Sequence, residues 1–225
     1  MATTRLQLRT RVQQRGYGTD SASAQNEALN SVQRRVVGMR RWPFLEVAAD
    51  TFSITVSDPE YTFTDIDATC GHVDAIGIQD GSERIELDFV QAPTLRRRER
   101  LFNETGTPDS WTRIGTAIRL YPNPDRALTG VADYVRKATE MAADGDNTVL
   151  PDDYADILVW GAVADIAIRQ RDYDTHQWAK GLFNEQLREM MNEYGVAQRQ
   201  NATEVVRTGE IDTVNRHIPN TWPVY

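Results

Sequence analysis

The sequence lacks the features that mark several large classes of protein. Cys70 is the only cysteine, so no disulfide forms within the chain, and such usage is typical of a reducing cytoplasm. No stretch approaches the roughly 18 consecutive apolar residues of a membrane span. The first residues carry four arginines and no apolar run, so we do not expect a secretory signal. With 225 residues, 40% of them hydrophobic, the chain can bury one large core or two smaller ones.

The sequence also lacks the short motifs of common catalytic and metal sites. It has no Gly-rich phosphate loop, no Gly-x-Ser-x-Gly elbow and no paired-cysteine or His-Glu-x-x-His motif. Cys70 and His72, flanked by Asp67 and Asp74, are the one cluster that could bind metal or act as a nucleophile. Two ligands on one strand or loop do not complete a site. We therefore predict a structural loop here, with no catalytic residue, metal, cofactor or enzymatic activity.

Charge is spread unevenly along the chain, whose net charge is −8. Residues 1–41 hold eight basic and two acidic side chains, whereas residues 42–150 hold ten and nineteen. A basic first segment on an acidic body favours contact with nucleic acid or with an acidic partner. The candidate arginines are Arg5, Arg9, Arg11, Arg15, Arg34 and Arg35. The acidic remainder argues against wrapping DNA, because phosphate affinity depends on clustered positive charge.

Two helices are predicted in the first 42 residues. Gly16-Tyr17-Gly18 separates them, and Asp20 or Ser21 can cap the second helix. Its apolar stripe at helical spacing consists of Ala28, Leu29, Val32, Val36 and Met39. Trp42-Pro43-Phe44 then ends the helix, because proline cannot continue it. We predict a structural hinge here, with Trp42 and Phe44 packed in the core.

Residues 46–149 are predicted to form a β-rich insertion. The alternating stretches that favour strands are Thr51–Val56, Val73–Gln79, Ile85–Val90, Ala117–Tyr121 and Leu128–Val135. Asp80-Gly81 is typical of a hairpin turn. The piece from Thr94 to Phe102 is predicted to be a short helix, and it carries Arg96, Arg97 and Arg98. These arginines are interpreted as solvated charge, as intersubunit salt bridges or, less favoured, as a DNA contact.

Residues 150–196 are predicted to form an antiparallel helical hairpin. Pro151, with Asp152 and Asp153 beside it, starts the first helix of the pair. Its predicted core face is Tyr154, Ile157, Leu158, Gly161, Ala164 and Ile168. The core face of the second helix, predicted to end at Gly195, is Trp178, Leu182, Phe183, Leu187, Met190 and Tyr194.

Residues 197–225 are predicted to be an extended C-terminal arm. The segment is polar and cannot cover a core alone, yet it ends in Trp222, Pro223 and Tyr225. Tryptophan and tyrosine are favoured anchors at protein interfaces. We interpret the segment as an arm that orders on a neighbouring molecule, with a frayed terminus as the alternative. The predicted class is α+β, with helices toward both ends of the chain, a β-rich middle and this arm.

Several motifs, in order along the chain, resemble the head-to-tail adaptor (connector) proteins of tailed bacteriophages, including tail tubular, gatekeeper and portal-adaptor proteins. The second helix runs into Arg41-Trp42-Pro43-Phe44-Leu45, similar to the family's junction. The stretch 116–125 resembles its strand followed by a Pro-x-Pro-Asp turn, and Leu150-Pro151-Asp152-Asp153-Tyr154 its entry into a helix of small residues. The helix from Asp172 to Tyr194 is similar to the family's last helix.

The resemblance implies a structural virion protein in which residues 1–45 and 150–196 form one helical bundle and residues 46–149 are a β-rich insertion. It also implies that the C-terminal arm, with Trp222, Pro223 and Tyr225, binds the portal or a neighbouring subunit. It implies a ring, usually of twelve copies, docked under the portal protein and joined to tail or stopper proteins, with DNA passing through the lumen unbound. Assembly in the host cytoplasm and no membrane contact are expected. The alternatives are a DNA-binding assembly or regulatory factor that uses the basic N-terminal helices, and a small enzyme with a site of unfamiliar form.

Overall fold

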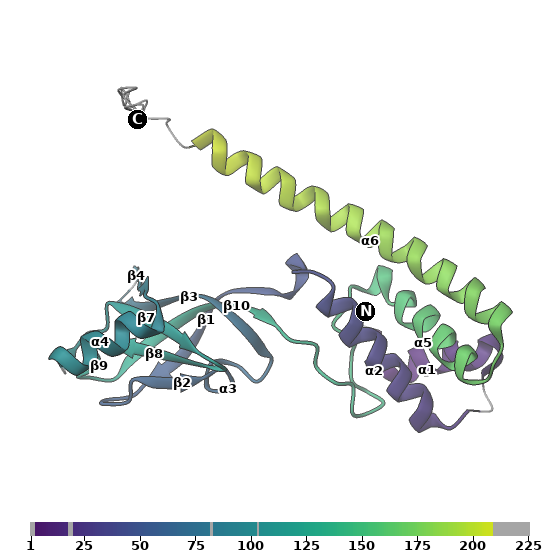
Figure 1. Cartoon of the computed structure of the whole chain (residues 1–225), viewed down its shortest axis with the longest axis horizontal. Coiled ribbons are helices and arrows are strands. Elements are labelled where there is room, and N and C mark those ends of the chain that lie inside the picture. Colours follow the sequence, from purple (N-terminus) through teal and green to yellow (C-terminus); the bar gives the residue numbers. More distant parts are fainter. Residues whose placement is uncertain (1–2, 18–19, 82, 103, 209–225) are drawn as a thin grey trace, which may run out of the picture.

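The chain folds into a helical lobe and a β lobe, joined by two connections (Figure 1). The computed structural model describes residues 3–17, 20–81, 83–102 and 104–208. The predicted α+β class is confirmed. Among the described residues, no helix has the length and apolar character needed to cross a membrane.

The helical lobe combines elements from both ends of the described chain. Its elements are α1 (Arg5–Val12), the π-helical turn η1 (Gln13–Tyr17), α2 (Ala22–Gly38), the 3-10 turns η2 (Pro43–Leu45) and η3 (Asp152–Tyr154), α5 (Asp156–Arg169) and α6 (Tyr173–Thr208). Gly16 has a φ of 99°, which suits glycine and breaks α1 from α2 as the sequence predicts. The Ser21 side chain accepts a hydrogen bond from the Ala24 N–H and thereby caps α2.

Helix α5 is the centre of the helical lobe. Almost every residue from Ile157 to Ala167 is buried, so this helix is surrounded by other elements on all sides. At Gly161 a Cβ atom would lie 2.5 Å from Val32 Cγ1, so α2 crosses α5 at a point that only glycine allows. Two residues of the predicted core faces are exposed instead: Ile168 at 45% and Trp178 at 57%.

Helix α6 departs from the prediction at both ends. Near its start Ala179 faces the core in place of Trp178, whose ring lies edge-on to Trp160 with centroids 5.0 Å apart. At its other end the helix continues past Gly195 to Thr208, so residues 197–208 of the predicted arm are helical. A glycine inside a helix costs only about 1 kcal/mol, and no proline follows before Pro219. The rest of the predicted arm, residues 209–225, lies outside the described residues.

The β lobe contains two four-stranded sheets, one small pair of strands and two helices. Its elements are β1 (Glu46–Ile54), β2 (Glu60–Thr62), α3 (Phe63–Ile66), β3 (Cys70–Asp80), β4 (Glu83–Glu86), β5 (Asp88–Phe89), α4 (Ala92–Phe102), β6 (Thr105–Gly106), β7 (Ser110–Ile114), β8 (Ala117–Tyr121), β9 (Asn123–Pro124) and β10 (Leu128–Arg136). The predicted helix is present, and so are the predicted strands except one: the stretch Ile85–Val90 is divided between β4 and β5, which belong to different sheets. The Asp80-Gly81 turn joins β3 to β4, and Gly81 has a φ of 61°.

The two large sheets share one apolar core. The first has the strand order β1-β10-β3-β4 and the second β2-β8-β7-β5. All pairs are antiparallel except β5 with β7 and β6 with β9. Phe52 and Ile54 of β1, Ile76 of β3 and Ile118 and Leu120 of β8 are buried between them. This alternation of inward apolar residues is the period-two pattern that the sequence shows.

The chain returns from the β lobe through a long connection, residues 137–151, that packs on the helical lobe. Two buried amide side chains of α2 hold this connection. Asn30 exchanges hydrogen bonds with the backbone of Met141 (3.0 and 3.3 Å), and Gln33 donates to the Thr139 carbonyl (2.7 Å). Met141 is buried in the helical core. The connection therefore belongs by its packing to the helical lobe.

Candidate interaction surfaces

The N-terminal arginines that were candidates for nucleic-acid contact lie beside acidic groups of the same chain. Their shortest N–O distances are 2.6 Å for Arg5–Asp144, 2.9 Å for Arg9–Asp144, 2.7 Å for Arg11–Asp156, 3.9 Å for Arg15–Asp156, 3.8 Å for Arg34–Glu140 and 2.5 Å for Arg35–Asp165. Hydrogen bonds from Arg9 and Arg5 hold the pKa of Asp144 below its ordinary value. Cations already paired with carboxylates offer little to phosphate. The basic segment therefore stabilises the chain's own fold.

Helix α4 carries exposed arginines of a different kind. Leu95 is fully buried and fixes the helix on the β lobe, while Arg96, Arg97 and Arg98 are exposed. Within the part of the chain that the structure describes, none of these three arginines has an acidic partner. Leu101 and Phe102 at the end of the helix are 63% and 61% exposed. Free arginines beside exposed apolar side chains are typical of protein interfaces.

Trp42, Pro43 and Phe44 lie where the helical lobe meets the β lobe. Trp42 is fully buried, its Nε1–H donates to the Val36 carbonyl at 2.9 Å, and its ring stacks on Phe44 with centroids 5.5 Å apart. Phe44 is half-buried and meets Tyr194 of α6 edge-on at 5.2 Å. The junction is thus packed against the last part of α6 whose side chains are described. Trp42 is buried in the helical core, whereas Phe44 is half-buried and packs against that core.

The cysteine and histidine of the Cys70-Gly71-His72 cluster face different environments. A β-bulge at Gly71 shifts the pairing of β3 with β10, so Cys70 is buried in the β core while the His72 side chain is half exposed. Burial raises the pKa of the Cys70 thiol to about 11, which leaves it protonated and unreactive at neutral pH. No cluster of three or more metal-ligating side chains occurs among the described residues. Cys70 and His72 therefore lie at the start of strand β3 and do not form the predicted loop.

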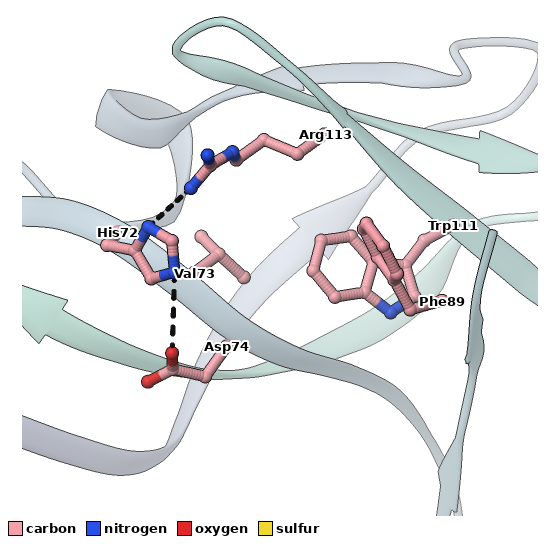
Figure 2. A pocket seen from close by; sticks show the side chains of 6 residues that line it. All are labelled: His72, Val73, Asp74, Phe89, Trp111 and Arg113. Carbon is pink, nitrogen blue, oxygen red and sulfur yellow. Dashed lines mark hydrogen bonds and ion pairs between the residues drawn. The ribbon is translucent and has the colours of Figure 1, made fainter. Parts of the chain in front are cut away.

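His72 lies instead at an open pocket of about 370 Å³ between the two large sheets (Figure 2). Val73 and Asp74 line the pocket beside it, and Phe89, Trp111 and Arg113 face them from β5 and β7. Figure 2 shows a chain of polar contacts along one wall. Arg113 contacts His72 Nδ1, and His72 Nε2 lies 3.5 Å from Asp74 Oδ1. The wall is therefore charged.

The opposite wall of the pocket is aromatic. Phe89 and Trp111 meet edge-on with centroids 5.0 Å apart, and Phe89 is 60% exposed while Trp111 is buried. Sequence analysis did not find this pocket, because its residues come from three strands that only the tertiary fold brings together. A pocket with one aromatic and one charged wall is suited to a polypeptide side chain.

Trp222, Pro223 and Tyr225, the predicted binding residues of the arm, lie outside the described residues. The described surfaces that remain are the α4 arginines with their apolar neighbours and the pocket between the sheets. Both have the chemistry of protein recognition. Together with the two-lobed fold, they indicate a component that binds other proteins.

Comparison with known families agrees with this class. The SU10 adaptor protein family matches residues 3–209, nearly the whole chain. The protein belongs to the SU10 adaptor protein family, so the resemblance to phage head-to-tail adaptors is confirmed at the level of the family. An adaptor has a structural role in a phage particle. No curated protein matches the sequence.

Proposed function

We propose that the protein is the head-to-tail adaptor of a tailed phage, forming a ring of about twelve copies under the portal. In this proposal it joins the portal protein to tail or stopper proteins, is assembled in the host cytoplasm, and encloses a lumen through which DNA passes without specific binding. Trp42-Pro43-Phe44 is the hinge between the bundle and the β insertion. The observation that carries the proposal is the family match over residues 3–209.

The distribution of charge supports this proposal over the DNA-binding alternative. The six arginines on which that alternative rests are paired with acidic groups of the same chain. The net charge of −8 leaves an acidic surface that repels phosphate and allows DNA to slide past. The α4 arginines, which have no acidic partner among the described residues, are candidates for contacts with a neighbouring copy. A closed ring needs such heterologous contacts.

Native mass spectrometry of the purified chain, alone and mixed with the portal protein, tests the proposal. We expect the chain alone to be largely monomeric, because its ring contacts are completed by the portal. With the portal, the mass should rise by a fixed number of copies, about twelve. A portal mass that does not change on mixing would overturn the adaptor function. A stable dodecamer of the chain alone at micromolar concentration would contradict assembly on the portal.

A further inference from the structure

The pocket between the sheets meets strand β3 at its edge. His72, Val73 and Asp74 all line the pocket, and β3 is irregular here, because β-bulges at Gly71 and Asp74 shift its pairing with β10. The pocket therefore runs along an irregular stretch of β3. Figure 2 shows Val73 between its two polar neighbours, directed toward Phe89 and Trp111. The geometry is that of a slot for an extended chain.

Both strands that border this slot have unpaired edges there. Strand β3 pairs with β10 along one side, but on the other side β4 covers only Gly77–Asp80. Strand β7 pairs with β8 along its length, whereas β5 covers only Ser110 and Trp111. Residues 72–75 and 112–114 therefore have no partner strand on the slot side among the described residues. Open strand edges bind extended peptides by strand addition.

The side chains around the slot define what such a peptide must carry. Phe89 is 60% exposed beside the buried Trp111, so the slot holds apolar aromatic surface that water covers poorly. Arg113 is exposed, contacts only the His72 ring, and has no carboxylate partner among the described residues. A guanidinium on one wall and aromatic rings on the opposite wall favour an incoming aromatic side chain, through the cation–π interaction on one side and ring packing on the other. The slot is thus suited to an extended peptide with an aromatic anchor.

We propose that the slot between β3 and β7 binds the C-terminal segment of a neighbouring copy, residues 209–225, as an added strand with Trp222 or Tyr225 against Phe89. This inference rests on the proposed function, because it needs copies held side by side. The partner of residues 209–225 is then the neighbouring subunit and not the portal. The contact joins two different surfaces of the chain, as a heterologous ring contact must.

The sequence of the segment supports this occupant. Its apolar residues before the end, Ile211, Val214 and Ile218, are separated by polar ones, and Trp222, Val224 and Tyr225 at the end supply the apolar anchors that the slot needs. A proline restricts the residue before it to extended backbone. Pro219 precedes these anchors, and Pro223 lies between Trp222 and Val224. Extended chain spans roughly 3.3–3.6 Å per residue, so 17 residues reach about 55–60 Å beyond Thr208. That reach exceeds the size of one lobe of this kind, about 30 Å across.

Peptide binding to the full chain tests the chemistry of the slot. The acceptor carries Trp222→Ala and Tyr225→Ala, so that its own segment does not compete, and the probe is a fluorescent peptide of residues 209–225. Adding Phe89→Ala to the acceptor should weaken binding about tenfold, the loss typical of an aromatic anchor. The matched control is Tyr173→Ala, which removes an equally exposed aromatic side chain on α6 and should change nothing. Binding that is undetectable at millimolar concentration, or equal in both variants, would overturn the proposal.

Disulfide trapping on portals tests whether the segment passes between copies. One chain carries Arg113→Cys and the other Val224→Cys, so only a contact between copies can link them; the native Cys70 is buried. We expect cross-linked dimers from this mixture and none when Gln177→Cys, exposed on α6, replaces Arg113→Cys. Rings that form without the cross-link would overturn this inference and leave the adaptor function intact. Failure to form rings with the unmodified chain would count against the adaptor function itself.

Discussion

Aromatic side chains determine how the residues at the junction of the two lobes pack. Trp42, Phe44, Tyr154 and Tyr194 come from three separate parts of the chain, and each ring meets at least one other within 6.4 Å. Trp42 is fully buried and also satisfies its polar N–H. Burial of such a ring contributes more to stability than most other single contacts in the core. The junction is therefore fixed by the side chains that follow α2.

Trp42→Ala should lower the free energy of unfolding by roughly 3–5 kcal/mol, as truncation of a buried aromatic ring does. The loss includes the stacking on Phe44 and the cavity left in the helical core. Chemical denaturation followed by circular dichroism measures it. The matched control is Trp178→Ala: that ring is 57% exposed and packs edge-on to Trp160, so the cost should not exceed about 1.5 kcal/mol. Equal losses in both variants would contradict the structure.

Arg84 of β4 and Asp133 of β10 form a bidentate ion pair across the first sheet, with N–O distances of 2.8 and 3.0 Å. The hydrogen bond from Arg84 holds the pKa of Asp133 below its ordinary value of about 3.8. A carboxyl whose pKa is lowered in the folded state stabilises the protein above its unfolded pKa, and this contribution is lost as the pH falls through the folded value. The stability due to this pair should therefore be complete at pH 6, begin to fall near pH 4, and be lost as the pH falls through the lowered pKa of Asp133.

Asp133→Asn should thus destabilise the protein by about 1 kcal/mol at pH 7, and the difference from the unmodified chain should shrink as the pH is lowered below 4. Thermal unfolding at a series of pH values measures this difference. Asp125→Asn is the control, because this exposed carboxylate has no ion-pair partner among the described residues. A difference that stays constant down to pH 3 would mean that the pair does not titrate as described.

The Cys70–His72 pair shows what a sequence can and cannot reveal about single residues. Alternation along a strand would place residues i and i+2 on one face, where they could act together. The bulge at Gly71 cancels this alternation, so the thiol enters the core and the imidazole reaches the slot. Bulges depend on pairing with a partner strand and leave little trace in the local sequence. Counting the possible metal ligands in the sequence was enough to predict that no metal site is present here. The sequence did not predict the bulge that sends the two side chains to different environments.

At the scale of elements, the crossing of α2 and α5 is the tightest contact of the helical lobe. A Cβ atom at Gly161 would meet Val32 Cγ1 at 2.5 Å and Cγ2 at 2.9 Å. Valine is β-branched and keeps one rotamer in a helix, so Val32 cannot turn away. Gly161→Ala should therefore lower the free energy of unfolding by about 1–3 kcal/mol, although alanine is the better helix former.

Gly181→Ala in α6 is the control for this prediction, because a Cβ atom there would meet nothing within 4 Å. That substitution should raise stability by about 0.5–1 kcal/mol, the difference in helix propensity between the two residues. Denaturant titration of both variants measures the change in unfolding free energy, which should be a loss for Gly161→Ala and a gain for Gly181→Ala. Stabilisation by Gly161→Ala would mean that the helices are further apart than the structure places them.

Helices and strands with strong patterns were predictable because local signals agree with the tertiary fold. The cap at Ser21, the stripe of α2 and the Asp80-Gly81 turn are examples in which a few neighbouring residues suffice. The end of α6 was not predictable from Gly195, since a helix stops only where a better alternative exists for the following residues. The parallel pair of β5 and β7 was also missed, because the partner strands are separated by the whole of α4.

Helix α4 leads to a prediction about nucleic acid. Arg96, Arg97 and Arg98 are exposed, but they stand on a chain with a net charge of −8. Replacing all three by alanine should leave duplex affinity at physiological salt weak and nearly unchanged, as measured by fluorescence anisotropy. A triple Arg→Lys variant, which keeps the charge, is the control. A submicromolar specific site, with a steep salt dependence that the alanine variant flattens, would support the DNA-binding alternative instead.

At the scale of the whole molecule, contacts between distant parts of the chain hold the helical lobe together. Arg5 and Arg9 reach Asp144, while Arg11 pairs with Asp156. From the sequence, the basic first segment could be assigned only to some acidic partner or to nucleic acid. The partner proves to be the same chain, because β10 returns the acidic connection to the helical lobe. The charge of each segment indicates that ion pairs can form, and only the topology shows which acidic residues the arginines contact.

The last prediction concerns residues 209–225. Their removal leaves α6 and both described cores complete, so the melting temperature of the truncated monomer should stay within about 2 °C of the full chain. If the segment binds the portal or a neighbouring copy, the same truncation should abolish incorporation onto portals, because a ring would lose its connecting strands. A full-length chain with Trp222→Ala and Tyr225→Ala keeps the length of the segment and loses only its aromatic anchors. This double variant should also fail to join portals. Sedimentation of portals mixed with each variant, followed by gel quantification, measures occupancy. Normal occupancy of the truncated chain would show that the segment is a frayed terminus and that the docking surface lies within the described lobes.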